Sequence, residues 1–312
     1  MKVFAMSNAN HAAAHGFTVK AAQPATPLRF VMPADACDCH THIHGAVETF
    51  PYFAGRLYTP GPALPDEMAA LHQALGIRRV VIVTPSVYGT DNAATLYGMR
   101  ARGADARGVA VLGEPVSARE LDLMHAAGIR GMRINLHTGG SSDPRLARKR
   151  FKADAQRMQA RGWHIQIFTT LDMVVALQDD IAASPVPVVL DHFGGAQAAA
   201  GVQQAGFEIL LSLLGCGHVY VKISGAYRCS TRAPDYADCT PLAQALIKAN
   251  ADRIVWGSDW PHPHSAVQDA ARLAPFYAID DGRLLNQLAD WAPDATLRRK
   301  ILVDNPARLY DF

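Results

Sequence analysis

The sequence predicts an α/β protein that folds as a single (β/α)8 TIM barrel, and three observations indicate this. Eight short runs rich in Val and Ile recur along the chain. Longer stretches with helical periodicity separate them, and this alternation is typical of a parallel sheet. No run is followed by a G-x-G-x-x-G turn, which disfavours the competing architecture, an open doubly wound sheet.

The eight runs are apolar enough for strands that are buried on both faces. We expect strands at 36–42, 79–84, 108–112, 131–136, 164–169, 187–191, 219–223 and 253–257. Several of the intervening segments begin with Pro, Asp or Ser and end near Gly, as helices do. We expect helices at 64–75, 118–127, 144–161, 171–183, 205–214 and 241–251, and a closing helix at 294–309.

Length and composition favour one globular domain. The chain has 312 residues, of which 49% are hydrophobic and 19% charged, and one barrel accommodates this length. Residues 1–30 contain no sustained apolar segment. We therefore expect a flexible N-terminal arm over 1–30 and the barrel domain over 31–312, with no prediction of oligomeric state.

Charge and cysteine content indicate the partners and the compartment. The formal net charge is +2 and the basic residues are scattered, so we expect a small-molecule partner and neither nucleic acid nor membrane. The five cysteines are an odd number in a chain that is large enough to fold without disulfides. This indicates a reducing compartment, and we expect a cytoplasmic protein.

Ionisable residues follow three of the expected strands. His40 and His42 end the strand at 36–42, and strand alternation places both on one face. His192 and Asp259 follow the strands at 187–191 and 253–257. Each residue alone is also compatible with a turn, a core histidine or a capping aspartate. Because active sites of barrels lie at the C-terminal ends of the strands, we predict that these four residues are catalytic.

Five motifs occur in order along the chain: DCHTH at 38–42, SVYGTDN at 86–92, GIRGMR at 128–133, DHFG at 191–194 and WGSDWPHP at 256–263. From about residue 35 onward the chain thereby resembles the amidohydrolase superfamily, in the branch of 2-pyrone-4,6-dicarboxylate lactonase and related lactone hydrolases. The resemblance implies that Asp259 activates the attacking water and that His40, His42 and His192 polarise a lactone carbonyl. Both roles suit these groups chemically.

The resemblance also implies the substrate contacts. Arg133 and Arg228 match positions that hold a substrate carboxylate, for which the guanidinium fork is suited. Tyr58, Ser86 and Tyr88 match positions of further contacts. We therefore expect an enzyme that hydrolyses a carboxylate-bearing lactone in aromatic or sugar-acid catabolism. Two alternatives stay open: a lactone isomerase that uses the same site, and a non-catalytic barrel that binds an acidic metabolite.

The chain departs from the family pattern at four positions. Phe168 stands where metal-dependent members have a histidine, and the strand at 131–136 carries neither a Lys nor a Glu that could bind metal. We therefore expect no cofactor, with one divalent ion such as zinc on His40, His42, His192 and Asp259 as the alternative. Gly139 and Gly195 stand where the dicarboxylate-specific lactonase has arginines. We therefore expect 2-pyrone-4,6-dicarboxylate not to be the best substrate.

Overall fold

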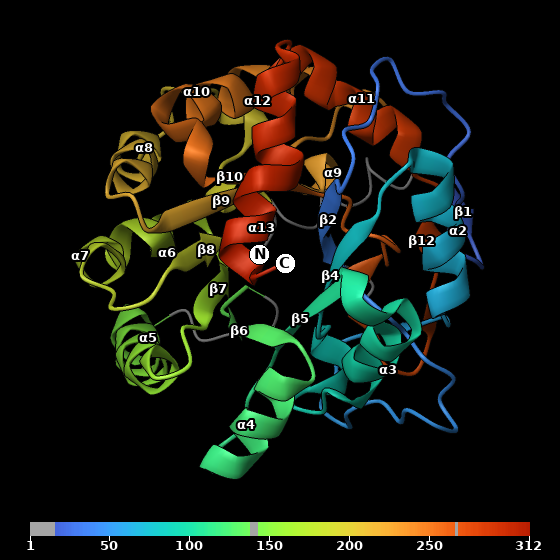
Figure 1. The fold of residues 1–312 in the computed structure, drawn as a ribbon, viewed down its shortest axis with the longest axis vertical. Helices are drawn as coiled ribbons and strands as arrows, with labels where there is room; N and C mark the ends of the chain where they lie inside the picture. The colour runs from blue at the N-terminus through green and yellow to red at the C-terminus, as the bar shows by residue number, and fades with distance from the viewer. Residues whose placement is uncertain (1–15, 138–142, 266–267) are drawn as a thin grey trace.

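The computed structural model describes residues 16–137, 143–265 and 268–312. Eight parallel strands form one sheet in the order β10-β9-β8-β7-β6-β5-β4-β2, and helices surround it (Figure 1). All eight predicted strands are present, with ends shifted by at most two residues. Their bounds are β2 Cys37–Thr41, β4 Arg79–Val83, β5 Ala106–Ala110, β6 Ile129–Asn135, β7 His164–Phe168, β8 Val188–Leu190, β9 Val219–Ser224 and β10 Ile254–Gly257.

The sheet closes between its first and last strands. The backbone N–H of Asp259 donates to the carbonyl of His40, and that of His42 donates to the carbonyl of Trp260. Asp38 reinforces this seam, because its carboxylate accepts hydrogen bonds from the backbone N–H and the hydroxyl of Ser258. The fold is therefore the predicted single-domain (β/α)8 barrel, and the seam fixes two of the predicted catalytic segments against each other.

Within the described residues, the predicted helices are present, and three further helices lie outside the predicted ranges. The observed bounds are α2 Pro65–Leu75, α4 Ala118–Ala126, α5 Pro144–Gln159, α6 Leu171–Ala176, α7 Gln178–Ala182, α8 Phe207–Gly215, α10 Thr240–Asn250, α12 Ala295–Arg299 and α13 Asn305–Tyr310, with a π-helical turn at Lys300–Asp304 between the last two. The missed helices are α3 Ala93–Arg102, α9 Ala226–Cys229 and α11 Asp281–Trp291.

Gly98 explains why α3 carries a weak helical signal. A Cβ at this position would lie 2.6 Å from Ile43 and 2.9 Å from Ile82. The helix therefore needs glycine to pack closely on the barrel, although glycine lowers intrinsic helix propensity. Close packing thus overrides the local preference of the sequence.

Two pairs of short strands lie outside the barrel sheet. β1 Phe17–Thr18 pairs with β12 Phe276–Tyr277, and β3 Thr59–Pro60 pairs with β11 Leu273–Ala274. Within the predicted arm, the backbone of Thr26 donates to Asp280, and that of Arg29 donates to Asn286. Residues 16–30 are therefore attached to the C-terminal part of the chain.

Apolar side chains fill both layers of the fold. One cluster lies between the strands and the helices. A second contains alternate residues of the strands, such as Val81, Val189 and Val255, together with Tyr310 of α13. In Figure 1, α13 lies across the middle of the barrel. This arrangement leaves the opposite end of the barrel, where the C-terminal ends of the strands lie, for the polar residues.

Candidate active site

The structure brings the four predicted catalytic residues together at the C-terminal ends of the strands. The carboxylate oxygen Oδ1 of Asp259 lies 3.6 Å from Nε2 of His40, 3.5 Å from Nε2 of His42 and 4.0 Å from Nε2 of His192. All four residues are buried. Three imidazole nitrogens from two different strand ends thus surround one carboxylate oxygen.

The backbone around these residues adopts uncommon conformations. His192 has φ 50° and Asp259 has φ 69°, in the left-handed region that costs a non-glycine residue free energy. Gly225 lies beside both, and a Cβ there would come within 3.1 Å of Asp259 and 3.2 Å of His192. At Gly257, a Cβ would come within 2.7 Å of His40. His192 and Asp259 thus adopt costly backbone conformations in a tightly packed site. Such strain is typical of functional sites.

Hydrogen bonds at Nδ1 assign the protons of two imidazoles. Nδ1 of His42 lies 2.7 Å from the carbonyl oxygen of Val83. Nδ1 of His192 lies 3.3 Å from the carbonyl oxygen and 3.0 Å from the hydroxyl of Ser224. A carbonyl only accepts, so we assign the proton of each neutral ring to Nδ1. Burial lowers the pKa of His192 to about 4, so its ring is neutral at pH 7. The ring of His192 therefore turns an Nε2 lone pair toward Asp259, and the neutral form of His42 does the same.

The other oxygen of Asp259, Oδ2, is held by the loop after β9. The Tyr227 hydroxyl and Nε of Arg228 both donate to it. Burial alone would raise the pKa of Asp259, but the charge of Arg228 holds it well below its usual value. Asp259 is therefore a carboxylate at neutral pH, with one oxygen fixed and the other facing the imidazoles. Tyr227 did not emerge from the sequence, because an isolated tyrosine after a strand carries no signal.

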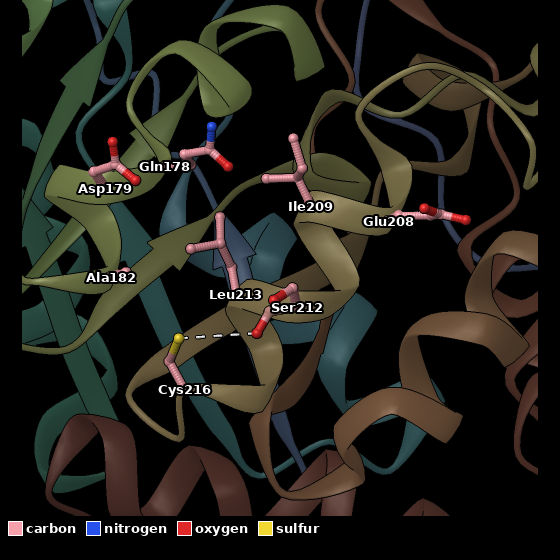
Figure 2. A pocket seen from close by; sticks show the side chains of 8 residues that line it. All are labelled: Gln178, Asp179, Ala182, Glu208, Ile209, Ser212, Leu213 and Cys216. Carbon is pink, nitrogen blue, oxygen red and sulfur yellow. Dashed lines mark hydrogen bonds between the residues drawn. The ribbon is translucent and has the colours of Figure 1, made fainter.

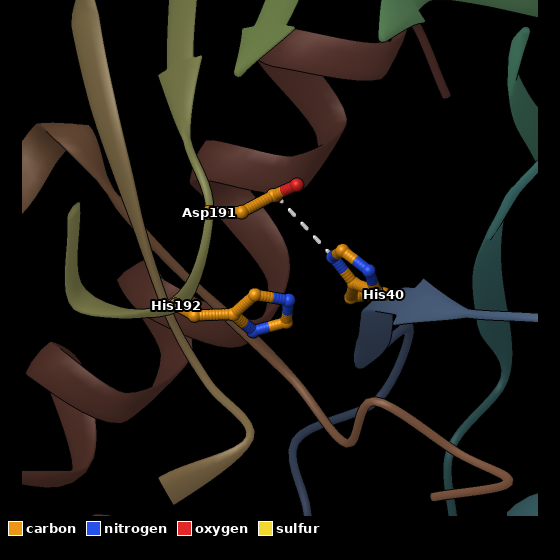
Figure 3. A group of neighbouring side chains, drawn as sticks. All are labelled: His40, Asp191 and His192. Carbon is orange, nitrogen blue, oxygen red and sulfur yellow. Dashed lines mark ion pairs between the residues drawn. The ribbon is translucent and has the colours of Figure 1, made fainter. Parts of the chain in front are cut away.

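Asp191 is a second buried carboxylate whose role the sequence did not predict. Its Oδ1 lies 3.3 Å from Nδ1 of His40, and Figure 3 shows His40, Asp191 and His192 pointing toward one another from β2 and the loop after β8. Its Oδ2 accepts hydrogen bonds from Gln166 at 2.9 Å and from Arg133 at 3.2 Å. Its position directly before His192 at a strand end was the available signal.

The predicted substrate-binding arginines lie beside this cluster. Nε of Arg133 bonds Asp191, and Nε of Arg228 bonds Asp259. Within the described residues, the hydrogen bonds of both guanidinium groups are made through Nε alone. Their terminal nitrogens are thus not used by these carboxylates.

Of the three residues predicted to contact substrate through hydroxyl groups, two lie near the arginines and one does not. Burial raises the pKa of Tyr58, and the charges of Arg228 and Arg133 and a hydrogen bond with Ser86 oppose this rise. Tyr58 and Ser86 therefore lie beside each other and near both guanidinium groups. In contrast, the hydroxyl of Tyr88 accepts a hydrogen bond from the backbone N–H of Gly45, so it supports the loop after β2.

Phe168 forms an apolar wall at the end of β7. Its ring stacks on His137 with a centroid distance of 4.5 Å and meets the edge of His192 at 5.0 Å. The guanidinium carbons of Arg133 and Arg228 lie 5.2 and 5.8 Å from its centroid. Burial lowers the pKa of His137 to about 4. His137 is thus a neutral ring at this wall, and the sequence motifs did not indicate it.

Of the two glycines for which the resemblance implies a lost arginine, Gly139 lies outside the described residues. Gly195 has φ 80°, and a Cβ there would lie 2.6 Å from the backbone nitrogen of Leu171 and 2.7 Å from the carbonyl oxygen of Thr169. Because backbone atoms cannot move aside cheaply, this loop cannot accept an arginine in its present conformation. The backbone of this loop therefore leaves no room for a larger side chain at position 195.

The donor set fits one divalent cation. Ligand atoms of His40, His42 and Asp259 lie within 4.8 Å of one another. Among the described residues, neither Nε2 of His40 nor Oδ1 of Asp259 has a hydrogen-bond partner. Imidazole nitrogens and a carboxylate oxygen are ligands of zinc in catalytic sites, and a hydrogen bond from the other ring nitrogen is typical of such histidines.

A surface groove lies far from this chemistry, between α7 and α8 on the outside of the barrel (Figure 2). Asp179, Glu208 and the exposed Cys216 are among its lining residues. None of the predicted site residues lines it. In the described part of the chain, no helix is long and apolar enough to cross a membrane.

The chain is similar to known proteins over most of its length. A family model described as amidohydrolase matches residues 37–312. The 4-sulfomuconolactone hydrolase of Rhizobium radiobacter is 38% identical, over 91% of this chain and 92% of its own. The 2-pyrone-4,6-dicarboxylate hydrolase of Comamonas testosteroni is 34% identical, over 93% and 94%. The D-galactarolactone isomerase of Agrobacterium fabrum is 29% identical, over 89% and 91%.

The fold is also found among solved structures. The ligand-free structure of the Agrobacterium tumefaciens protein ATU3138 superposes with a TM-score of 0.78 at 26% identity. The superposition covers 95% of this chain and 99% of that chain. The barrel and its loops are therefore shared over almost the whole length of both proteins.

Proposed function

Because the chain belongs to the amidohydrolase family and is an enzyme, we propose that it hydrolyses a lactone that bears a carboxylate. One observation carries this proposal: the three imidazole nitrogens that surround Oδ1 of Asp259 at 3.5–4.0 Å. Two curated relatives are hydrolases of lactones by name. Family membership also removes the reason to consider a non-catalytic binding barrel.

The cluster can hold a water molecule for attack. Oδ1 of Asp259 and the Nε2 lone pairs of His42 and His192 are acceptors for the two O–H groups of water. The water oxygen adds to the lactone carbonyl while one of its protons passes to Asp259, a general base in reach of the same point. The acyl–oxygen bond of the ring then breaks, the proton returns to the leaving ring oxygen, and the product is a hydroxy acid.

Neutral histidines change the roles that the family resemblance implies. With the proton on Nδ1, the rings of His42 and His192 accept hydrogen bonds at Nε2 and do not donate them. Only His40 can then offer an N–H to the oxyanion, provided that its proton lies on Nε2. Such a donor aimed at developing charge is a large catalytic contribution.

Positive charge in the site suits an anionic substrate. Three cations, Arg133, Lys222 and Arg228, face two carboxylates, Asp191 and Asp259, so one positive charge remains when the imidazoles are neutral. The terminal nitrogens of the two arginines can hold a substrate carboxylate by paired hydrogen bonds. Tyr58 and Ser86 add hydroxyl groups beside them.

The site also supports the alternative of one divalent ion, held by His40, His42, His192 and Asp259. A bound ion would lower the pKa of water and polarise the carbonyl. The lowered pKa of Asp259 makes this residue a weak base by itself, which favours such assistance. Metal analysis of the purified enzyme, with turnover before and after chelation, decides between the two; turnover that survives removal of all metal supports the metal-free route.

A lactone panel tests the proposed reaction. It should contain carboxylated furanones and pyrones, a sulfonated muconolactone and aldonolactones, with ring opening followed by absorbance or proton release. We expect turnover of a carboxylated lactone and a poorer kcat/KM for 2-pyrone-4,6-dicarboxylate, because Gly195 leaves no place for a further arginine. No turnover of any lactone by metal-free or metal-loaded enzyme would refute the proposal.

The similarity to a galactarolactone isomerase favours one second candidate, isomerisation of a lactone at the same site. The same acceptors could move a proton or an acyl group within the substrate without net addition of water. Reaction in oxygen-18 water separates the two, because hydrolysis places the label in the product carboxylate. An unlabelled product would establish isomerisation.

A further inference from the structure

Lys222 of β9 is a fully buried ammonium beside the active site. Its Nζ lies 2.7 Å from Oε1 of Gln166, 3.4 Å from Nδ1 of His40 and 3.5 Å from Oδ1 of Asp191. Its exposed fraction is 0%. Burying an ammonium costs several kcal/mol unless partners compensate, and the hydrolysis proposed above gives Lys222 no direct role. Its burial in the barrel therefore calls for a different explanation.

We propose that Lys222 is a positioning residue that sets the tautomer of His40 and thereby lowers the affinity of the site for a divalent cation. An ammonium group has no lone pair, so it can only donate to His40. Its hydrogen bond requires an unprotonated Nδ1. A neutral imidazole then carries its proton on Nε2, 3.6 Å from Oδ1 of Asp259.

Asp191 competes with Lys222 for the same ring nitrogen. Its Oδ1 lies 3.3 Å from Nδ1 of His40 and would favour the opposite tautomer, with the proton on Nδ1. The contact from Lys222 has hydrogen-bond geometry, whereas Oδ1 of Asp191 has no hydrogen-bond partner among the described residues.

The two tautomers have different consequences at the centre of the site. With the proton on Nε2, His40 offers a donor for an oxyanion and lacks a lone pair for a metal. With the proton on Nδ1, all three imidazoles present lone pairs to a cation. The fixed charge of Lys222 also repels a cation. Both effects act in the same direction, so removing Lys222 should strengthen metal binding.

Zinc affinity of the metal-free enzyme, measured by competition with a chromophoric chelator, tests this inference. Loss of a partner that orients a ligating histidine typically lowers metal affinity by about 10–100-fold, and we expect removal of Lys222 to act in the opposite direction. We expect Lys222→Met to bind zinc about 10-fold more tightly than wild type or better. As a matched control, Lys300→Met removes a surface lysine that pairs with Asp252 and should leave the affinity unchanged. A lysine that only supports the fold would give unchanged or weaker binding in Lys222→Met, and this result would overturn the inference.

Two further measurements keep the inference testable if Lys222→Met fails to fold. Lys222→Gln retains a hydrogen-bonding side chain without the charge and should also bind zinc more tightly. In the wild-type protein, nitrogen-15 NMR of metal-free enzyme reads the His40 tautomer directly. A proton on Nε2 supports the inference and a proton on Nδ1 contradicts it. None of these measurements depends on lactone turnover. A failure of this inference can therefore be distinguished from a failure of the proposed function.

Discussion

Asp191 and Asp259 are two buried aspartates that follow β8 and β10, and their surroundings differ. Asp191 lies between two cations, Lys222 and Arg133, and its Oδ2 accepts two hydrogen bonds. Asp259 has one cation, Arg228, and that arginine and Tyr227 occupy only Oδ2. Oδ1 of Asp259 faces three imidazoles instead.

This difference separates a carboxylate that organises its neighbours from one that is poised to react. A carboxylate between two cations is neutralised and fixed, so it is a poor proton acceptor. Oδ1 lacks a hydrogen-bond partner in both residues among those described, but Oδ1 of Asp191 faces the ammonium of Lys222. Oδ1 of Asp259 faces imidazoles instead, so this carboxylate can accept a proton from water or bind a cation. The same residue type at equivalent places in the barrel thus serves two purposes, and the neighbouring side chains decide which.

The largest expected effect is that of Asp259→Asn on turnover. The amide cannot accept the proton of the attacking water, so we expect kcat to fall by about 10²–10⁴-fold. Turnover of the best lactone in the panel measures this, with circular dichroism to confirm folding. Asp290→Asn, at a surface pair with Arg29, is the matched control. Activity close to that of wild type would assign the base to another group.

Asp191→Asn should affect stability more than Asp259→Asn does. The change leaves Lys222 and Arg133 buried without their counter-charge, and breaking a buried pair costs about 3–5 kcal/mol. Turnover should fall less than in Asp259→Asn, because the attacking water keeps its acceptor. Urea unfolding and kcat of the two variants, measured together, test the comparison. Equal losses of both quantities in the two variants would show that the aspartates do not differ in role.

A smaller effect is expected at the other end of the barrel, where His164 begins β7. Burial lowers its pKa to about 3, so the unfolded chain binds this proton between about pH 6.5 and 3 while the folded protein does not. Stability should therefore fall as the pH drops through this window, by about 1.4 kcal/mol per pH unit for one histidine.

Urea unfolding at pH 7, 5.5 and 4.5 checks this pH dependence. His164→Phe keeps a ring of similar size. It should reduce the slope of the unfolding free energy against pH by the contribution of about one proton. His218→Phe is a partly buried comparison on the barrel exterior. An unchanged slope in His164→Phe would mean that His164 does not titrate as its burial suggests.

The smallest effect is expected in the groove between α7 and α8. Cys216→Ser changes an exposed side chain, and such surface substitutions usually alter stability by no more than about 0.5 kcal/mol. Lactone turnover and the melting temperature should stay at wild-type values. A clear loss of turnover would link the groove to the active site.

Much of the fold could be predicted because its strands are short, apolar and regularly spaced. The eight strands are found with small shifts at their ends. The helix α3 was not predicted, because Gly98 is required for close packing against Ile43 and Ile82 although glycine lowers helix propensity. The convergence of His40, His42, His192 and Asp259 follows from barrel topology. Lys222 and Gln166 could not be connected with them, since nothing local in the strand sequence shows which interior side chains meet across the barrel.

The sequence by itself determined the barrel, the family and the four residues at the centre of the site, because strand periodicity and motif order are local properties of the chain. Only the tertiary structure decided which ring nitrogens face Asp259, that Arg133 and Arg228 already hold carboxylates of the protein, and that Lys222 contacts His40. These features depend on distances between strands that are far apart in the sequence. Hydrogen bonding and charge act over a few ångströms, so they are set only when the barrel closes.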